Sequence, residues 1–168
     1  MKKNILFVFI YSLLISCSQE KATTYYLIRH AEKDRTDLTN RNPNLNDKGI
    51  ERAKKWAEYF KGIDLDAVYS TDYNRTQQTA TPTSISKNLD IISYDPKNQY
   101  TPNFQNNTKG KSVLIVGHSN TIPKFANEIL NTNSFKDIND NENSKLFIIS
   151  IKPSFIKKNA SVRIVHVN

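Results

Sequence analysis

The chain has 168 residues, of which 38% are hydrophobic and 24% charged, and its formal net charge is +8. This length and composition suit one globular domain with a sizeable core, and no repeat of fixed period is present. Lysines are spread along the chain without an arginine-rich helix or a basic run interleaved with aromatic residues, so nucleic-acid binding is not expected. The positive charge fits a solvated surface or one that attracts anionic substrates.

The first residues read as an export signal. Lys2 and Lys3 precede the apolar run 5–15, which is too short for a comfortable membrane span. The following Leu14-Ile15-Ser16-Cys17 resembles the lipobox of bacterial lipoproteins, which implies lipidation of Cys17. A plain secretory signal with an incidental cysteine is the alternative. We therefore expect a signal peptide at 1–16, a tether at 17–23, a domain at 24–168, and a protein anchored in the cell envelope as a periplasmic or outer-membrane lipoprotein.

Apolar runs and amphipathic stretches alternate along residues 24–168. One helix begins at Asn46 or Asp47 and ends at Gly62, and its apolar face comprises Ile50, Ala53, Trp56, Ala57 and Phe60. In chain order, we expect a strand at 24–28, this helix, a strand at 67–69, a helix at 73–88 capped by Ser70 or Asp72, a short strand at 91–93, a loop at 95–111, a strand at 113–116, a helix at 121–130, and two antiparallel edge strands at 146–151 and 162–167. The alternation predicts an α/β fold, a three-layer α/β/α sandwich around a mostly parallel central sheet.

Basic side chains follow three of these predicted strands. Arg29 and His30 come at the end of the first strand, Arg75 shortly after the second, and His118 just after the apolar strand 113–116. Side chains at the carboxyl ends of parallel strands occupy the edge where α/β proteins bind ligands. The convergence of two arginines and two histidines at this edge predicts a phosphate site.

Four motifs occur in a fixed order: Arg29-His30-Ala31-Glu32, Leu45-x-x-x-Gly49-x-x-Arg52-Ala53, Ser70-x-x-x-x-Arg75-Thr76-x-x-Thr79-Ala80 and Gly117-His118-Ser119-Asn120. Together they resemble the histidine phosphatase superfamily, over about residues 24–130. The resemblance implies the phosphoglycerate mutase-like fold. It also implies a phosphate pocket of Arg29, His30, Arg75 and His118, with Ser119 and Asn120 beside it, and it implies no metal or other cofactor.

The chemistry of phosphoryl transfer explains why these residue types suit the site. A phosphoryl group spreads negative charge over its oxygens, and the forked donors of Arg29 and Arg75 match that geometry. A neutral His30 can attack phosphorus and form a phosphohistidine that water hydrolyses. His118 is expected to stabilise the developing charge. Arg52 is expected on a solvated helix face, and His166 matches no motif, so we expect a structural role for it.

The general acid that protonates the leaving group is harder to assign. The candidates are Asp95, in a segment without glutamate, and Glu32, two residues after His30; for each, a surface carboxylate is the alternative. Without an acid, alkyl phosphates should react more slowly than aryl phosphates or phosphoramidates. Substrate choice is expected to depend on residues 36–46 and 94–107.

These observations predict a phosphatase that hydrolyses phosphomonoesters or phosphoramidates. The region after Arg75 lacks a long insertion, which argues against a mutase. The expected partners are a phosphorylated small molecule or an envelope component, and we expect a monomer. The alternative is an envelope lipoprotein that binds phosphate ligands without catalysis.

Overall fold

The structure is a computed structural model that describes residues 20–154 and 159–168. The predicted signal peptide and the predicted lipidation site Cys17 lie outside these residues. The elements, in chain order, are β1 (Thr23–Arg29), α1 (Asp47–Phe60), β2 (Ala67–Ser70), α2 (Asn74–Lys87), β3 (Ile91–Ser93), α3 (Pro102–Thr108), β4 (Ser112–Gly117), α4 (Thr121–Leu130), β5 (Lys145–Lys152) and β6 (Asn159–His166). Within the described ranges, no helix has the length and apolar character needed to cross a membrane.

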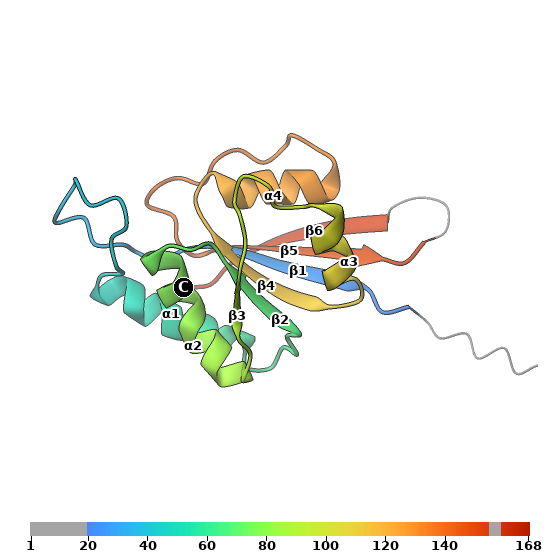
Figure 1. The fold of residues 1–168 in the computed structure, drawn as a ribbon, viewed down its shortest axis with the longest axis horizontal. Coiled ribbons are helices and arrows are strands. Elements are labelled where there is room, and N and C mark those ends of the chain that lie inside the picture. Colours follow the sequence, from blue (N-terminus) through green and yellow to red (C-terminus); the bar gives the residue numbers. More distant parts are fainter. Residues whose placement is uncertain (1–19, 155–158) are drawn as a thin grey trace, which may run out of the picture.

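The strands form one six-stranded sheet in the order β3-β2-β4-β1-β5-β6 (Figure 1). β3, β2, β4 and β1 run parallel, whereas β5 pairs antiparallel with both β1 and β6. The mostly parallel sheet and the two antiparallel edge strands confirm the predicted α/β architecture. The carboxyl ends of β1, β2 and β4 lie at one edge of the sheet, where the loop after β1 projects (Figure 1).

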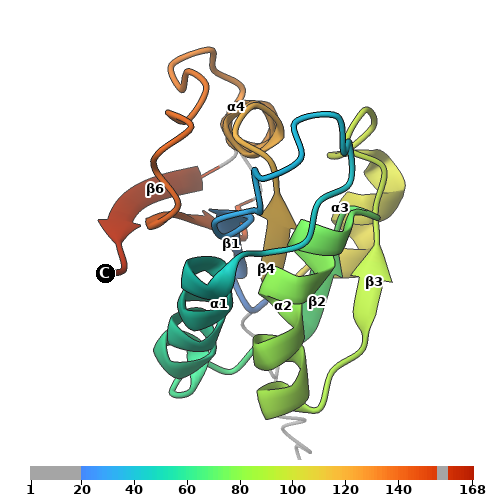
Figure 2. The ribbon, with the colours of Figure 1, turned by 90° about the vertical axis from the view of Figure 1, so that its left-hand side faces the viewer.

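Both faces of the sheet are covered by helices. In β1, Leu27 points to a core shared with α3 and α4, and the next residue, Ile28, points to a core shared with α1 and α2. This alternation follows from the two-residue period of a strand. Trp56 and Phe60 anchor α1, and Phe125 anchors α4. Figure 2 shows α1 and α2 on one side of the sheet and α4 on the other. The three-layer sandwich predicted from the sequence is therefore confirmed.

Helix α1 begins where expected, but its buried face is shifted. The side chain of Asn46 caps the helix by accepting a hydrogen bond from the Gly49 amide at 2.9 Å. Ile50, predicted to be buried, is 45% exposed, and Gly49 is buried instead. Gly49 packs so closely against the backbone of residue 32 that a β-carbon here would lie 2.1 Å from the Glu32 carbonyl oxygen. The close approach of the Glu32 backbone, rather than hydrophobicity, therefore decides which residue in the first turn of α1 is buried.

Two other predictions on the helices were wrong. Helix α2 is preceded by Tyr73 as its N-cap, without a side-chain capping bond, and neither Ser70 nor Asp72 takes that place. Residues Pro102–Thr108 form helix α3 inside the segment expected to be a loop. Its signals are local: the Thr101 side chain accepts a hydrogen bond from the Phe104 amide, and Pro102 occupies the first turn. The buried Phe104 then fastens this short helix to the core.

Candidate active site

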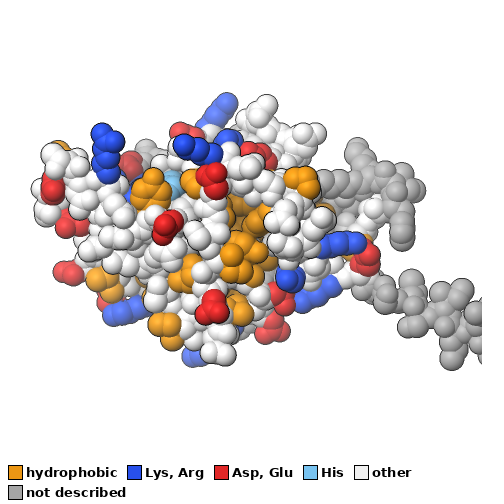
Figure 3. Space-filling model, in the orientation of Figure 1, with side chains coloured by type: hydrophobic (Ala, Val, Ile, Leu, Met, Phe, Trp, Pro, Cys, Tyr) orange, Lys and Arg blue, Asp and Glu red, His pale blue; other side chains and the backbone are white. Residues whose placement is uncertain are grey.

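The ends of the parallel strands bring His30 and His118 together. The His30 amide donates to the Gly117 carbonyl at 2.8 Å, which places the residues after β1 and β4 side by side. The two imidazole rings meet edge to face, with centroids 5.6 Å apart. Figure 2 looks at this edge of the sheet, and Figure 3 shows a histidine reaching the surface near Lys and Arg side chains.

The hydrogen bonding of His30 defines its tautomer. Its Nδ1 lies 2.7 Å from the Ala31 carbonyl oxygen, which can only accept, so Nδ1 carries the proton and Nε2 keeps a free lone pair. His30 is only 4% exposed. Burial, together with the nearby Arg29, Arg75 and His118, lowers the pKa of His30 to about 3 in spite of the Ala31 hydrogen bond. At neutral pH, His30 is therefore an uncharged base with Nε2 as its nucleophilic atom.

A chain of hydroxyl groups orients His118. The Thr76 hydroxyl donates to the Thr71 carbonyl at 2.8 Å, and the Thr71 hydroxyl donates to Thr76 Oγ1 at 3.0 Å. Nε2 of His118, 3.0 Å from Thr71 Oγ1, must then be the donor, so Nδ1 carries the lone pair and faces Nη2 of Arg75 at 3.4 Å. Burial lowers the pKa of His118 to about 4, and Arg75 adds to the effect. Thr71 was not among the predicted site residues; its position directly after β2 is the signal that could have found it.

Arg75 lies in the first turn of α2, next to His118. Its guanidinium carbon sits 4.6 Å from the centre of the Tyr73 ring, and its Nη1 donates to the Arg41 carbonyl at 3.5 Å. Within the described part of the chain, the buried Nε of Arg75 has no hydrogen-bond partner, and the same is true of Nε of Arg29. Buried donors are nearly always paired in proteins. Two unpaired arginine N–H groups near His30 are what a site for an oxyanion requires.

Arg29 is held by the loop between α4 and β5. The residue is 2% exposed, and its Nη1 donates to the carbonyls of Asn139 and Asp140, each at 2.9 Å. Its Nη2 donates to the carboxylate of Asp140 at 2.5 Å. In the same loop, the Asn143 side chain donates to the His30 carbonyl at 2.8 Å. No residue of the asparagine-rich stretch 139–143 was among the predicted site residues.

His30 opens into a cavity of about 540 Å³. Its lining includes the cations Arg29, Lys33, Arg35 and Lys48 and the anions Glu32, Asp34 and Asp140, but not Arg75 or His118. A cavity of this size is in the range of small-molecule sites and exceeds the space that a phosphoryl group alone needs. In the described residues, no group of three or more His, Cys, Asp or Glu side chains is arranged to hold a metal ion.

Glu32 also lines this cavity, but its carboxylate is bound to Arg52. Nε and Nη2 of Arg52 lie 2.9 and 2.8 Å from the Glu32 carboxylate, and the Arg52 Nη1 donates to the Val167 carbonyl at 3.2 Å. The prediction that Arg52 lies on a solvated helix face was wrong, because this guanidinium is 16% exposed and ties the loop after β1 to the end of the chain. With both oxygens taken by one guanidinium, Glu32 is poorly placed to deliver a proton.

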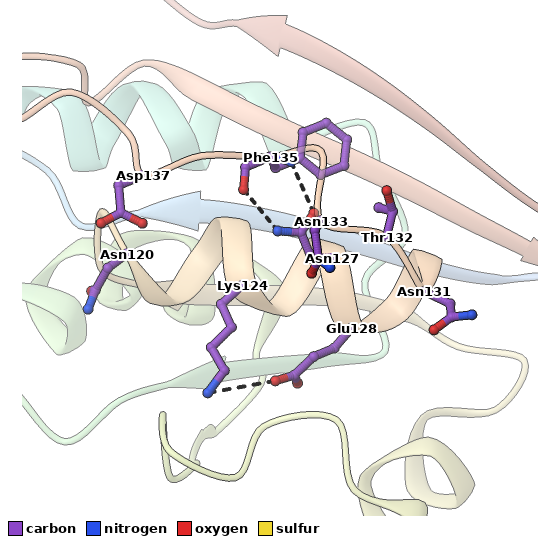
Figure 4. A pocket seen from close by; sticks show the side chains of 9 residues that line it. All are labelled: Asn120, Lys124, Asn127, Glu128, Asn131, Thr132, Asn133, Phe135 and Asp137. Carbon is purple, nitrogen blue, oxygen red and sulfur yellow. Dashed lines mark hydrogen bonds and ion pairs between the residues drawn. The ribbon is translucent and has the colours of Figure 1, made fainter.

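The other predicted polar residues lie away from the cavity. Asp95 is exposed in the turn after β3, where its carboxylate accepts from the Lys97 amide at 2.9 Å. Asn120 is the N-cap of α4 and lines a separate cavity of about 440 Å³ along that helix (Figure 4). The Ser119 carbonyl accepts from the Ile138 amide at 2.9 Å and thereby holds the middle of the loop 131–144. None of these three residues lines the cavity of His30.

Comparison with known proteins relates this geometry to a family. A family model described as the histidine phosphatase superfamily (branch 1) matches residues 25–96, a stretch that includes Arg29, His30 and Arg75. A mycobacterial glucosyl-3-phosphoglycerate phosphatase superposes with a TM-score of 0.66 at 12% identity, covering 88% of this chain and 100% of that one. The chain has the phosphoglycerate mutase-like fold.

Two further structures share this fold. The protein histidine phosphatase SixA, solved with tungstate, matches with a TM-score of 0.65 at 15% identity, over 85% of this chain and 96% of its own. A phosphoglycerate mutase from Bacillus anthracis matches with a TM-score of 0.63 at 15% identity, over 88% of this chain and 94% of its own. No curated protein sequence matches the chain. In the phosphoglycerate mutase-like fold of this chain, His30 and His118 occupy the ends of the two neighbouring central strands β1 and β4.

The depressed pKa of His30 predicts a pH dependence of stability. Below pH 6.5 the unfolded chain takes up a proton on this histidine, whereas the folded state stays neutral down to about pH 3. The stability associated with neutral His30 is thus complete above pH 6.5 and is lost as the pH falls towards 3, at about 1.4 kcal/mol per pH unit. In thermal melts between pH 7 and pH 4, the melting temperature should fall less steeply for His30→Asn than for the unmodified protein. Parallel curves would contradict the buried, neutral state of His30.

Proposed function

We propose that the chain is a member of the histidine phosphatase superfamily that hydrolyses phosphomonoesters or phosphoramidates through a phosphohistidine on His30. The observation that carries the proposal is the tautomer of His30, whose Nδ1 is fixed by the Ala31 carbonyl and whose Nε2 is free. The match of residues 25–96 to the superfamily model and the phosphoglycerate mutase-like fold support it.

In the first step, Nε2 of His30 attacks phosphorus. A P–N bond forms while the bond from phosphorus to the leaving oxygen or nitrogen breaks, and the leaving group departs with that electron pair. The unpaired Nε donors of Arg29 and Arg75 are available to the phosphoryl oxygens. The positive charge that develops on His30 lies beside the negative phosphoryl group. The two arginines thus supply charge at fixed positions, and we expect no metal requirement.

In the second step, water attacks phosphorus and the P–N bond breaks. Inorganic phosphate leaves, the electron pair returns to Nε2, and the water proton passes to solvent. His118 contributes through its position: binding of a dianionic phosphoryl group raises its pKa from the low value of the unliganded site, so that a protonated Nδ1 can donate to a phosphoryl oxygen. Thr71 keeps the ring oriented throughout.

The engagement of Glu32 by Arg52 and the exposed position of Asp95 indicate that neither of these two carboxyl groups protonates the leaving group. We therefore expect 4-nitrophenyl phosphate to be hydrolysed with a kcat/KM at least about 100-fold above that of ethyl phosphate, since general acid catalysis contributes about 10² or more when present. Phosphate release in the presence of EDTA measures both rates. Equal rates would contradict the lack of an acid. Phosphate binding without turnover of either ester would overturn the proposed function and favour a non-catalytic phosphate-binding protein.

We also propose that the protein is exported and anchored to the cell envelope through a lipid on Cys17. The basis is the sequence pattern of residues 1–17. Its substrate would then be a phosphorylated small molecule or envelope component. Metabolic labelling with a fatty acid tests the anchor, because Cys17→Ser should remove the label.

A further inference from the structure

The Asp140 carboxylate bridges two arginines in the cavity of His30. One of its oxygens accepts from Nη2 of Arg29 and the other from Nη2 of Arg35, each at 2.5 Å. Arg29 is buried, whereas the side chains of Arg35 and Asp140 are 49% and 60% exposed. An oxyanion of this chain therefore already occupies a position between two guanidinium groups in the cavity that also holds the nucleophile.

The contacts of Asp140 allow its side chain to leave while its backbone stays. The backbone carbonyl is bound to Nη1 of Arg29 at 2.9 Å, independently of the carboxylate. The carboxylate makes hydrogen bonds only to Arg29 and Arg35 among the described residues. The pair with Arg35 is exposed, and exposed ion pairs are weak. Rotation of one side chain would free both guanidinium groups for an external anion.

Four cationic side chains, Arg29, Lys33, Arg35 and Lys48, line the cavity together with three carboxylates, Glu32, Asp34 and Asp140. Lys33 lines it and forms no ion pair with any residue that the structure describes. Burial lowers the pKa of Lys33, the neighbouring cations Arg35, Arg75 and Arg29 lower it as well, and Asp140 acts in the opposite direction. Arg35 and Lys33 have no part in the proposed attack by His30, so their charge requires another explanation.

We propose that Arg35 and Lys33 form a second anion subsite beside the phosphoryl pocket, so that the preferred substrates carry a second oxyanion, a carboxylate or a phosphate, near the reacting phosphoryl group. The inference rests on the proposed function of His30. Asp140 is the internal occupant of this subsite and gives way to the substrate. Arg35 is then a residue that determines specificity.

Binding of three stable phosphonates to the purified full chain tests the subsite. The probes are 3-phosphonopropionate, ethane-1,2-bisphosphonate and 3-phosphonopropionamide, whose amide group is uncharged, with Kd measured by calorimetry. Both probes that carry two anionic groups should bind at least about fivefold more tightly than the amide, which carries one. Preference for one of them identifies the second group as carboxylate or phosphate. Arg35→Gln should abolish the preference, and Arg163→Gln, which removes the same charge from exposed β6, should keep it.

Asp140→Asn provides an independent test. Removal of the competing carboxylate should tighten binding of 3-phosphonopropionate by about threefold and preserve its advantage over the amide. Equal Kd values for the three probes, an unchanged preference in Arg35→Gln, or weaker binding to Asp140→Asn would overturn the subsite.

Turnover separates this inference from the proposed function. If 3-carboxyphenyl phosphate and 3-carbamoylphenyl phosphate are hydrolysed equally well and the probes bind equally, the subsite fails and the phosphatase stands. If neither is hydrolysed but the binding preference depends on Arg35, the phosphatase fails and the subsite stands.

Discussion

Replacement of His30 by Asn is expected to reduce kcat on 4-nitrophenyl phosphate by at least about 10⁴-fold, because no other histidine among the described residues lines the cavity. The Asn side-chain amide can still donate to the Ala31 carbonyl as Nδ1 of His30 does, so the fold should survive. Steady-state phosphate release measures the loss, and circular dichroism checks the fold.

His166→Asn is the matched control for this substitution. His166 is exposed at the end of β6, beside Ser144 and Glu142 and outside the cavity of His30. Its replacement should leave turnover unchanged. A folded His30→Asn protein with normal turnover would rule out His30 as the nucleophile, and a comparable loss in His166→Asn would show that the effect is not specific to the cavity.

Replacement of Arg75 by Gln should lower kcat/KM by about 10²- to 10³-fold, the effect of losing one preorganised donor to a transferring group. The guanidinium contacts His118 and Tyr73 at the edge of the site, and its Nε is buried without a partner in the described residues. Gln keeps a polar side chain but lacks the positive charge and the forked N–H donors of the guanidinium. The measurement is kcat/KM for 4-nitrophenyl phosphate at several ionic strengths.

Arg41→Gln controls for loss of charge in the same region. Only the backbone carbonyl of Arg41 contacts Arg75, so that contact survives the substitution. Arg41→Gln should therefore retain most of the activity. If Arg75→Gln is no worse than Arg41→Gln, Arg75 acts only through its long-range field and not as a donor to the phosphoryl group.

The sequence predicted the sheet, the strand ends and the meeting of His30 with His118 because these follow from short-range patterns. Continuous apolar runs such as 113–116 read as buried strands, and basic residues directly after them must lie at the carboxyl edge. Helix α3 was missed because a helix of seven residues carries too little periodicity to be separated from a loop.

What the sequence could not predict are contacts between distant segments. The Arg29–Asp140 pair joins residues 111 positions apart, and the Arg52–Glu32 pair depends on how the loop after β1 folds back onto α1. Neither has a local signature, since a carboxylate in an asparagine-rich loop looks like any solvated turn. The general acid was the hardest residue to predict. Glu32 lies two residues after His30, which makes it a candidate, but its carboxylate is bound to Arg52 in the structure.

Trapping of the phosphoenzyme tests the central claim most directly. The protein is mixed with 4-nitrophenyl phosphate labelled at phosphorus and quenched either in acid or in base. We expect a protein-bound phosphoryl group that survives base and is lost in acid, as a phosphoramidate is, and that is absent from His30→Asn. Turnover without any such adduct, or an adduct that persists in His30→Asn, would contradict a phosphohistidine on His30.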